Sequence, residues 1–310
     1  PEEGEFPSSP FFIFLRKEED MSELDPYQSK AVYSNSKSIA VISAAGSGKT
    51  RVLTHRIVEL IQRGVDPSNI LAITFTRDAA DVLKQRISKM LGSKCGVTAC
   101  TIHSLCYRIV KSAREKYGQP GLKVISESSR WKFLREAVNI KLGPFGFSIC
   151  PPELLLETID RMKEKGIPFS AAPLKLAFFI SRYEELKKGY SDFGDLLLEA
   201  NRVLSNDPKL LKEWRDRFTH ILVDEVQDVS PAQVRVIEKL AQGQSLFIVG
   251  DPSQCIYAWR GADPNLFMKL ARMSEAEICE LPINYRSTES IVKAAAAVDR
   301  GPLAKKLQSV

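Results

Sequence analysis

The string SAAGSGKT at residues 43–50 constrains this chain more than any other feature. It follows the apolar run at residues 39–42 and precedes a segment, 51–63, whose apolar residues recur at helical spacing. A strand, a glycine-rich loop and a helix in this order form a phosphate cradle, because backbone N–H groups and the helix N-terminus point at the same anionic oxygens. The string therefore predicts a nucleotide site at the edge of an α/β sheet.

The residues of this phosphate loop have distinct expected roles. Gly46 and Gly48 allow a close approach that a Cβ would block, Lys49 reaches the β- and γ-phosphates, and the Thr50 hydroxyl ligates Mg²⁺. The usual pattern G-x-x-x-x-G-K-[ST] has glycine at the position of Ser43. An ordinary glycine-rich turn at a helix start is the alternative, and the flanking strand and helix patterns favour the phosphate loop.

Two acidic strings, DEVQD at residues 224–228 and GDPSQ at residues 250–254, each follow a short apolar run. Ligands of open α/β sheets gather beyond the carboxyl ends of the strands, so both strings are expected at the edge that holds the phosphate loop. Asp224 is the expected Mg²⁺ ligand, and Glu225 is placed to orient or deprotonate the attacking water. Gln254, whose amide both donates and accepts, suits a sensor of the γ-phosphate.

Five further strings accompany these three: LDPYQ at 24–28, AITFTRDAA at 72–80, TIHSL at 101–105, IYAWRGA at 256–262 and NYRST at 284–288. The eight strings in this order resemble the N-terminal half of a superfamily 1 DNA helicase of the UvrD/Rep type. Departures are few: Val226 occupies a variable position, and Pro252 and Ser253 stand where acidic or small residues are common. None of them removes a chemical group that the site needs.

The resemblance implies an ATP site with Mg²⁺. Gln28 is implied to read the adenine edge, Tyr285 to stack on the base, and Arg286 to act as an arginine finger toward the γ-phosphate. Without the resemblance, Arg286 would be interpreted as a surface arginine near a helix start. The expected catalytic residues are Lys49, Asp224, Glu225, Gln254 and Arg286; the nucleotide contacts are Gln28, Ala45, Gly46, Ser47, Gly48, Lys49, Thr50, Arg51 and Tyr285; the metal ligands are Thr50 and Asp224.

The resemblance also implies a track for single-stranded DNA. Aromatic faces stack on any base, at roughly 1 to 3 kcal/mol per base, which gives affinity without sequence preference. An isolated tryptophan such as Trp259 is more often part of a core, but the neighbouring Arg260 and Gly261 favour an exposed loop. The expected DNA contacts are Thr74, Phe75, His103, Tyr257, Trp259 and Arg260, with Thr76 and Ser104 as further donors to phosphate oxygens.

Composition is compatible with this interpretation. The 310 residues, 44% of them hydrophobic, suffice for two domains, and the net charge of +6 mildly favours an anionic partner. The six cysteines form no C-x-x-C pair, so structural zinc and a disulfide framework are disfavoured and a reducing, intracellular compartment is expected. No segment approaches the roughly 18 to 20 apolar residues that cross a bilayer.

Between residues 106 and 209 strand-like runs disappear and helical patterns take over, for example at residues 131–138 and 174–186. Five basic residues in this segment are compatible with a DNA path, and neighbouring glutamates favour an ordinary solvated helix face; the five are Lys163, Lys165, Arg182, Lys187 and Lys188. The expected fold is a RecA-like parallel sheet flanked by helices, with a mostly helical inserted subdomain. Its expected parts are a flexible extension (1–23), a RecA-like ATP-binding domain 1A (24–105 and 210–290), a helical insertion 1B (106–209) and the start of a connection to a second RecA-like domain (291–310).

The expected function is that of an ATP-dependent DNA helicase or translocase of 3′ to 5′ polarity. Its expected partners are ATP, single-stranded DNA, junctions of single- and double-stranded DNA, and repair or recombination proteins, in a nucleus or in a bacterial cytoplasm or nucleoid. Because family members continue into a second RecA-like domain that closes the ATP cleft, we expect a fragment with weak ATP binding, little turnover and no unwinding. A nucleotide-dependent DNA-binding module and the motor part of a RecB-like helicase–nuclease are the alternatives.

Overall fold

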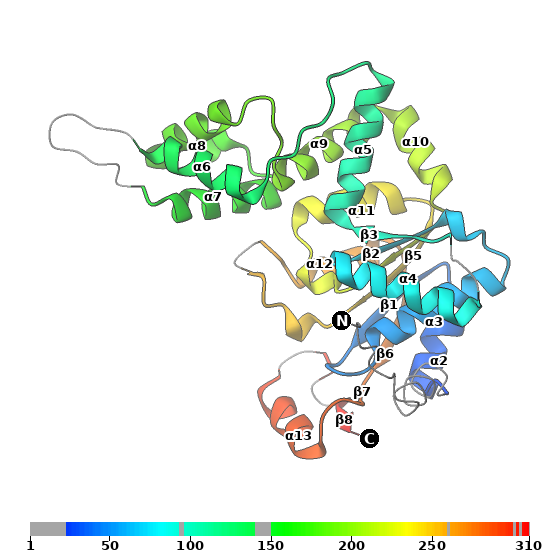
Figure 1. The fold of residues 1–310 in the computed structure, drawn as a ribbon. Helices are drawn as coiled ribbons and strands as arrows, with labels where there is room; N and C mark the ends of the chain where they lie inside the picture. Colours follow the sequence, from blue (N-terminus) through cyan, green and yellow to red (C-terminus); the bar gives the residue numbers. More distant parts are fainter. Residues whose placement is uncertain are drawn as a thin grey trace, which may run out of the picture.

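A six-stranded parallel sheet forms the centre of the computed structural model, with helices on both faces (Figure 1). The strand order is β3-β2-β4-β5-β1-β6, so the predicted α/β fold is confirmed. The strands are β1 (Ser38–Ser43), β2 (Ile70–Thr74), β3 (Thr98–Thr101), β4 (His220–Val223), β5 (Ser245–Gly250) and β6 (Glu277–Leu281). The structure describes residues 23–92, 96–139, 150–258, 261–299, 302–303 and 306–309.

Alternate residues of the strands belong to two apolar cores, one on each face of the sheet. In β1, Ile39 and Val41 lie in one core and Ala40 and Ile42 in the other, which explains the continuous apolar run. Helices α2 (Pro26–Tyr33), α3 (Lys49–Gln62) and α4 (Arg77–Leu91) cover the first core. The second is covered by α5 (Ile102–Lys116), α9 (Phe193–Asn206), α10 (Pro208–Arg217), α11 (Pro231–Ala241) and α12 (Asn265–Met273).

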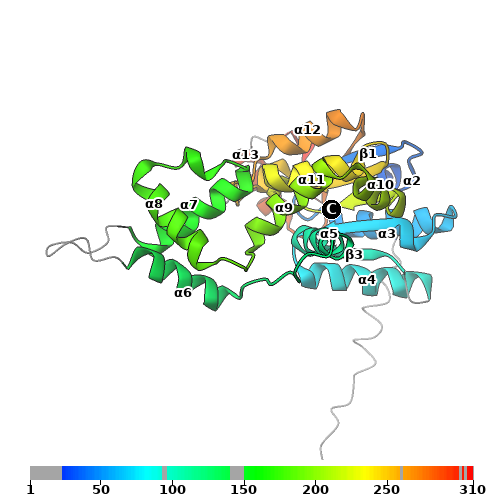
Figure 2. The ribbon, with the colours of Figure 1, turned by 90° about the horizontal axis from the view of Figure 1, so that it is seen from above.

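Three further helices form a separate body beside the sheet domain, as both views show (Figures 1 and 2). They are α6 (Glu127–Val138), α7 (Pro152–Lys165) and α8 (Leu174–Leu186), and they enclose a core of their own around Leu134, Ile159 and Tyr183. The helices predicted at residues 131–138 and 174–186 are confirmed as α6 and α8. The segment 106–209 thus contains this helical body and also most of α5, all of α9 and the first two residues of α10, and these three helices pack on the sheet.

The chain continues after the sheet into β7 (Ile283–Asn284), α13 (Glu289–Val298) and β8 (Gln308–Ser309), and β7 pairs with β8. Residues 1–22 lie outside the described part of the chain, and so do Trp259 and Arg260, on which two of the expected DNA contacts fall. None of the described helices has the length and apolar character of a membrane span.

Candidate nucleotide site and adjoining groove

The phosphate loop between β1 and α3 approaches its neighbours closely at two glycines. Gly46 and Gly48 have φ angles of +67° and +86°, in the left-handed region that favours glycine. A Cβ at Gly46 would lie 2.7 Å from Arg286 Cβ, and one at Gly48 would lie 2.9 Å from Gln28 Nε2. Because Gly48 directly precedes the first residue of α3, the helix N-terminus opens at this loop.

The NYRST string lies against the phosphate loop although it is far away in sequence. Tyr285 N donates to Gly46 O at 3.0 Å, and Asn284 Nδ2 donates to Ala45 O at 2.8 Å. The other end of the same buried amide, Asn284 Oδ1, accepts from Arg286 N at 2.8 Å. Asn284 therefore holds Tyr285 and the exposed Arg286 beside the loop. It carried no predicted role, and its place at the head of the NYRST string is the feature that could have indicated one.

The two residues expected to bind adenine meet at one rim of the loop. Gln28 is buried, and its Nε2 donates to Ser47 O at 3.0 Å while its Oε1 accepts from Asp25 N at 3.4 Å. Tyr285 exposes its ring, and its hydroxyl donates to Asp25 Oδ2. Partial burial and this hydrogen bond raise the pKa of Tyr285 to about 12. Both ends of the Gln28 amide are thus engaged in hydrogen bonds within the chain.

Strand β4 delivers two carboxylates to the same edge. Glu225 Oε2 lies 3.6 Å from Lys49 Nζ, so the loop lysine and the expected water-orienting acid are paired. Burial, and next the charge of Glu225, raise the pKa of Asp224 to about 7. Glu225 has a φ of +50°, a strained conformation for a residue with a Cβ and one that is common at functional sites.

The GDPSQ string begins at the end of β5, next to β1. Ser43 Oγ donates to Gly250 O at 2.9 Å, so the serine that departs from the usual loop pattern ties the ends of two neighbouring strands together. Gln254 Nε2 donates to Asp251 Oδ2 at 2.8 Å. Burial also raises the pKa of Asp251. These contacts keep Gln254 near the strand edge that carries the phosphate loop.

The residues at this edge fit a magnesium-bound nucleotide. The loop offers backbone N–H groups and Lys49 to phosphate oxygens. Ser47 Oγ is buried and has no hydrogen-bond partner among the described residues, as expected of a group reserved for a ligand. Thr50 and Asp224 carry oxygen ligands of the kind that Mg²⁺ prefers.

A groove of about 740 Å³ connects the DEVQD string with the residues expected to contact DNA. Phe75 and Tyr257 stack in it with ring centroids 5.1 Å apart and ring planes 24° apart. Thr74, Thr76, His103 and Ser104 line the same groove, as do Asp224, Glu225 and Asp228. The structure thus brings together the four described residues of the expected DNA track.

A family model described as the UvrD/REP helicase N-terminal domain matches residues 24–274. The chain belongs to the UvrD/Rep helicase family. Over 293 residues it is 32% identical to the ATP-dependent DNA helicase PcrA of Staphylococcus aureus (strain NCTC 8325 / PS 47), which covers 89% of this chain and 40% of the relative. Over 304 residues it is 34% identical to DNA helicase II of Escherichia coli (strain K12). This alignment covers 93% of this chain and 42% of that relative. The chain spans about two fifths of the length of these relatives.

In this UvrD/Rep family member, two groove residues come from elements that carry no family string. Glu164, near the end of α7, has its Oε1 3.9 Å from His103 Nε2 and accepts a hydrogen bond from Ser230 Oγ at the start of α11. The rings of Phe193 and His103 pack edge to face, with their centroids 5.4 Å apart. Sequence reasoning missed both, because only the packing of α7 and of the start of α9 next to His103 brings them to the groove.

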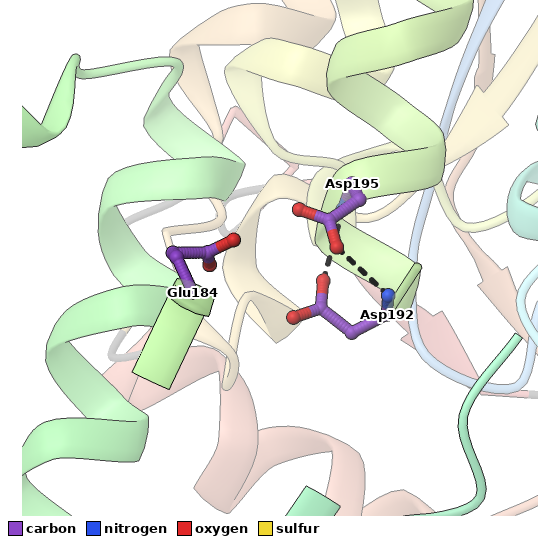
Figure 3. Close-up of side chains that lie close together, drawn as sticks. All are labelled: Glu184, Asp192 and Asp195. Atoms are coloured by element: carbon purple, nitrogen blue, oxygen red, sulfur yellow. Dashed lines mark hydrogen bonds between the residues drawn. The ribbon is translucent and has the colours of Figure 1, made fainter. Parts of the chain in front are cut away.

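Away from the nucleotide site, three carboxylates lie close enough together to hold a metal ion: Glu184, Asp192 and Asp195 (Figure 3). However, Lys163 Nζ and Lys187 Nζ each lie 2.6 to 3.0 Å from all three carboxylates. The two ammonium groups supply the positive charge that a metal would bring, so we interpret these five residues as an ion network in which Lys163, Lys187 and Asp192 are buried. The expectation that Lys163 and Lys187 line a DNA path or a solvated helix face was wrong, since both are buried.

Proposed function

We propose that this chain is the ATP-binding and single-stranded-DNA-binding half of an ATP-dependent DNA helicase or translocase. The observation that carries the proposal is one groove lined both by the acids of the DEVQD string and by the stacked pair Phe75 and Tyr257. In a DNA-translocating motor the nucleotide site and the DNA contacts lie close together, because ATP hydrolysis must respond to bound DNA. Relatives that are named ATP-dependent DNA helicases support the same activity.

The residues of the site suggest how hydrolysis proceeds. Lys49 and the loop amides hold the β- and γ-phosphates, and Thr50 and Asp224 hold Mg²⁺, which when bound neutralises phosphate charge. Glu225 accepts a proton from the water that attacks the γ-phosphorus. The bond from this phosphorus to the bridging oxygen breaks, and ADP keeps that oxygen. Arg286 and Gln254 contact the γ-phosphate, with the arginine offsetting the charge that develops during transfer.

For the base of the nucleotide, we propose stacking on the exposed ring of Tyr285. Gln28 reads the adenine edge by exchanging its present contact with Ser47 O for one with the base. This exchange costs little where one hydrogen bond replaces another. Ala45, Gly46, Gly48 and Arg51 complete the proposed nucleotide contacts.

The proposed DNA track consists of Thr74, Phe75, His103 and Tyr257 in the groove, with Trp259 and Arg260 on the adjoining segment. Stacking on the aromatic pair gives affinity that does not depend on sequence. We further propose 3′ to 5′ movement, loading at junctions of single- and double-stranded DNA, and work alongside repair or recombination proteins. The place of action is inside the cell, in the compartment that holds the DNA.

The domain division stays part of the proposal. Domain 1A comprises residues 24–105 and 210–290, the insertion 1B comprises residues 106–209, and residues 291–310 lead toward a second RecA-like domain. Because two such domains close around the nucleotide in a motor of this kind, we propose that this chain alone binds ATP weakly and turns it over slowly.

The test is ATP turnover with and without a single-stranded oligonucleotide, on this chain and on the full-length protein, with Lys49→Ala in each. We expect DNA-stimulated turnover by the full-length protein, abolished by Lys49→Ala and unchanged by Lys212→Ala, a control at an exposed lysine of α10. We expect little turnover by this chain. A full-length protein that binds ATP and DNA without turnover would favour a binding module instead, and robust unwinding by this chain would contradict the proposal.

A further inference from the structure

Gln227, the fourth residue of the DEVQD string, is buried and uses its side-chain amide in three hydrogen bonds. Its Nε2 donates to Glu225 Oε2 at 2.8 Å and to Asp228 Oδ2 at 3.3 Å. Its Oε1 accepts from Asp251 N at 3.0 Å. Both amide N–H groups and the oxygen are therefore engaged. None of the predicted roles falls on this residue.

The backbone opposite Gln227 is shaped to receive the amide. Gly250, the last residue of β5, lies so close that a Cβ there would be 2.6 Å from Gln227 Oε1. The described glycines with positive φ do not include Gly250, so the close approach is what requires glycine at this position. From the neighbouring strand, Ser43 Oγ holds the carbonyl of Gly250. The contact between DEVQD and GDPSQ is thus tightly packed from both sides.

The three partners of Gln227 belong to three different parts of the proposed motor. Glu225 faces Lys49 of the phosphate loop. Asp251 begins the short segment that carries Gln254 and continues to Tyr257 of the aromatic pair. Asp228 lines the groove. A change in the groove segment can therefore reach the carboxylate of Glu225 through a single side chain.

An amide suits this position better than a charged group. Burial and the charge of Glu225 already raise the pKa of Asp228 to about 6, so the pocket disfavours more negative charge. A lysine would pair with Glu225 and weaken it as a base, because a neighbouring positive charge favours the ionised carboxylate. The amide orients two carboxylates without adding charge.

We infer that Gln227 is a positioning residue for ATP hydrolysis: it holds the carboxylate of Glu225 in place and links it to the Gln254 segment and the DNA groove, so that turnover responds to DNA. This inference rests on the proposed function. A merely structural amide would satisfy the same backbone and leave turnover per bound nucleotide unchanged, so the split between binding and turnover separates the two roles.

The test uses Gln227→Met in the full-length protein, because methionine keeps the length of the side chain and removes its hydrogen bonds. We expect kcat to fall by about tenfold or more and DNA stimulation to disappear, while the Kd values for a non-hydrolysable ATP analogue and for an oligonucleotide stay within about twofold. Gly250→Ala, which displaces the same amide, should reproduce the loss. Gln244→Met is the matched control, since Gln244 Nε2 only donates to Arg215 O at 3.1 Å.

A second readout needs no turnover. Hydrogen exchange at the Asp251 N–H should become faster in Gln227→Met, whereas the N–H of Val249, inside β5, keeps its protection. A kcat within about twofold of the unaltered protein, or a fall in kcat that accompanies lost ATP binding, overturns the inference. Absence of DNA-stimulated turnover in the unaltered protein overturns the proposed function and the inference together, so the two failures are distinguishable.

Discussion

At the scale of single residues, Asp224 lies where the charged form proposed for metal binding lowers the stability of the fold. Asp224 directly follows the buried strand β4, and the backbone N–H of Glu225 donates to Asp224 Oδ1 at 3.0 Å. Burial and the charge of Glu225 raise its pKa from 3.8 to about 7, and Lys49 only partly opposes this. The charged form that a metal needs is therefore costly in the protein alone.

This predicts a pH-dependent gain in stability for Asp224→Asn. Since the folded-state pKa is raised, the stability that comes with the protonated acid is present below about pH 4 and is lost as the pH rises through about 7. Asparagine stays neutral and keeps the acceptor for Glu225 N. Without Mg²⁺, Tm should rise by a few degrees at pH 8 and by about half as much at pH 5.5, which lies midway between the two pKa values.

Thermal unfolding at the two pH values checks this, with Asp216→Asn at an exposed aspartate of α10 as control. An equal Tm change at both values, or a lower Tm at pH 8, would contradict it. Turnover of ATP should be lost in Asp224→Asn whatever the pH, because the proposed metal ligand is removed.

Gly46 and Gly64 both have a left-handed backbone conformation, so comparing them distinguishes the cost of that conformation from the effect of a Cβ on the site. Gly46 and Gly64 both have positive φ, but a Cβ at Gly64 meets nothing within 4 Å whereas one at Gly46 collides with Arg286 and Asn284. Both alanine variants should lose roughly 1 kcal/mol of stability from the left-handed conformation. Only Gly46→Ala should raise the Kd for nucleotide, by about tenfold or more. Equal affinity in the two variants, measured by titration with a fluorescent analogue, would argue against the phosphate-loop geometry.

At the scale of elements, the ion network joins α7 and α8 of the helical body to the start of α9. Burial lowers the pKa of Lys163, but the three surrounding carboxylates outweigh it, and the net shift is upward. Burial likewise raises the pKa of Asp192, but Lys163 and Lys187 lower it overall. The side chain of Lys163 packs directly on Gly194, where a Cβ would lie only 2.6 Å from Lys163 Cδ.

Removing one charged residue of this network should therefore lower the free energy of unfolding. Lys163→Met leaves the buried carboxylate of Asp192 and two half-buried ones with one ammonium group in place of two, and breaking a buried pair costs about 3 to 5 kcal/mol. Lys165→Met, an exposed change two residues later, should cost less than about 0.5 kcal/mol. Urea unfolding of this chain measures both free energies. Similar small values for the two variants would mean that the network contributes specificity without stability.

At the scale of the whole molecule, the helical body is attached by two adjacent segments. Ile125 N donates to Ser191 O at 3.0 Å, and Ser191 N donates to Lys123 O at 2.8 Å, so the chain leaves and returns at the same place. The body has its own core, while α5 and α9 complete the core of the sheet domain. The groove between them is shared, because Glu164 reaches His103 and Ser230 from the body.

Replacing residues 126–190 with a short glycine–serine linker should leave the sheet domain folded. We expect one cooperative unfolding transition and a nucleotide Kd within about threefold of the parent chain, because both cores at the sheet remain. Oligonucleotide affinity should change, since the groove loses Glu164. Circular dichroism and two binding titrations check this. Loss of cooperative unfolding would show that the body is required for the sheet domain to fold.

By itself, the sequence determined the strand, loop and helix around the phosphate loop and the family, because apolar periodicity and short strings with fixed spacing are local properties. The α/β sheet followed, since apolar runs long enough for strands buried on both faces alternate with helical patterns. The roles of Lys49, Glu225 and Phe75 stay predictions that the geometry supports. Only the folded chain shows that Glu225 and Phe75 line one groove and that Lys49 pairs with Glu225.

Only the tertiary structure decided which polar side chains serve the fold and which face a ligand. Lys163 looked like any surface lysine, yet it is buried because three carboxylates from two other elements meet it. Gln227 carried no predicted role, yet its side chain links the segment after β4 to the segment after β5 by accepting from Asp251 N. Contacts between segments far apart in sequence leave no periodic trace, so packing, and not pattern, determined these roles.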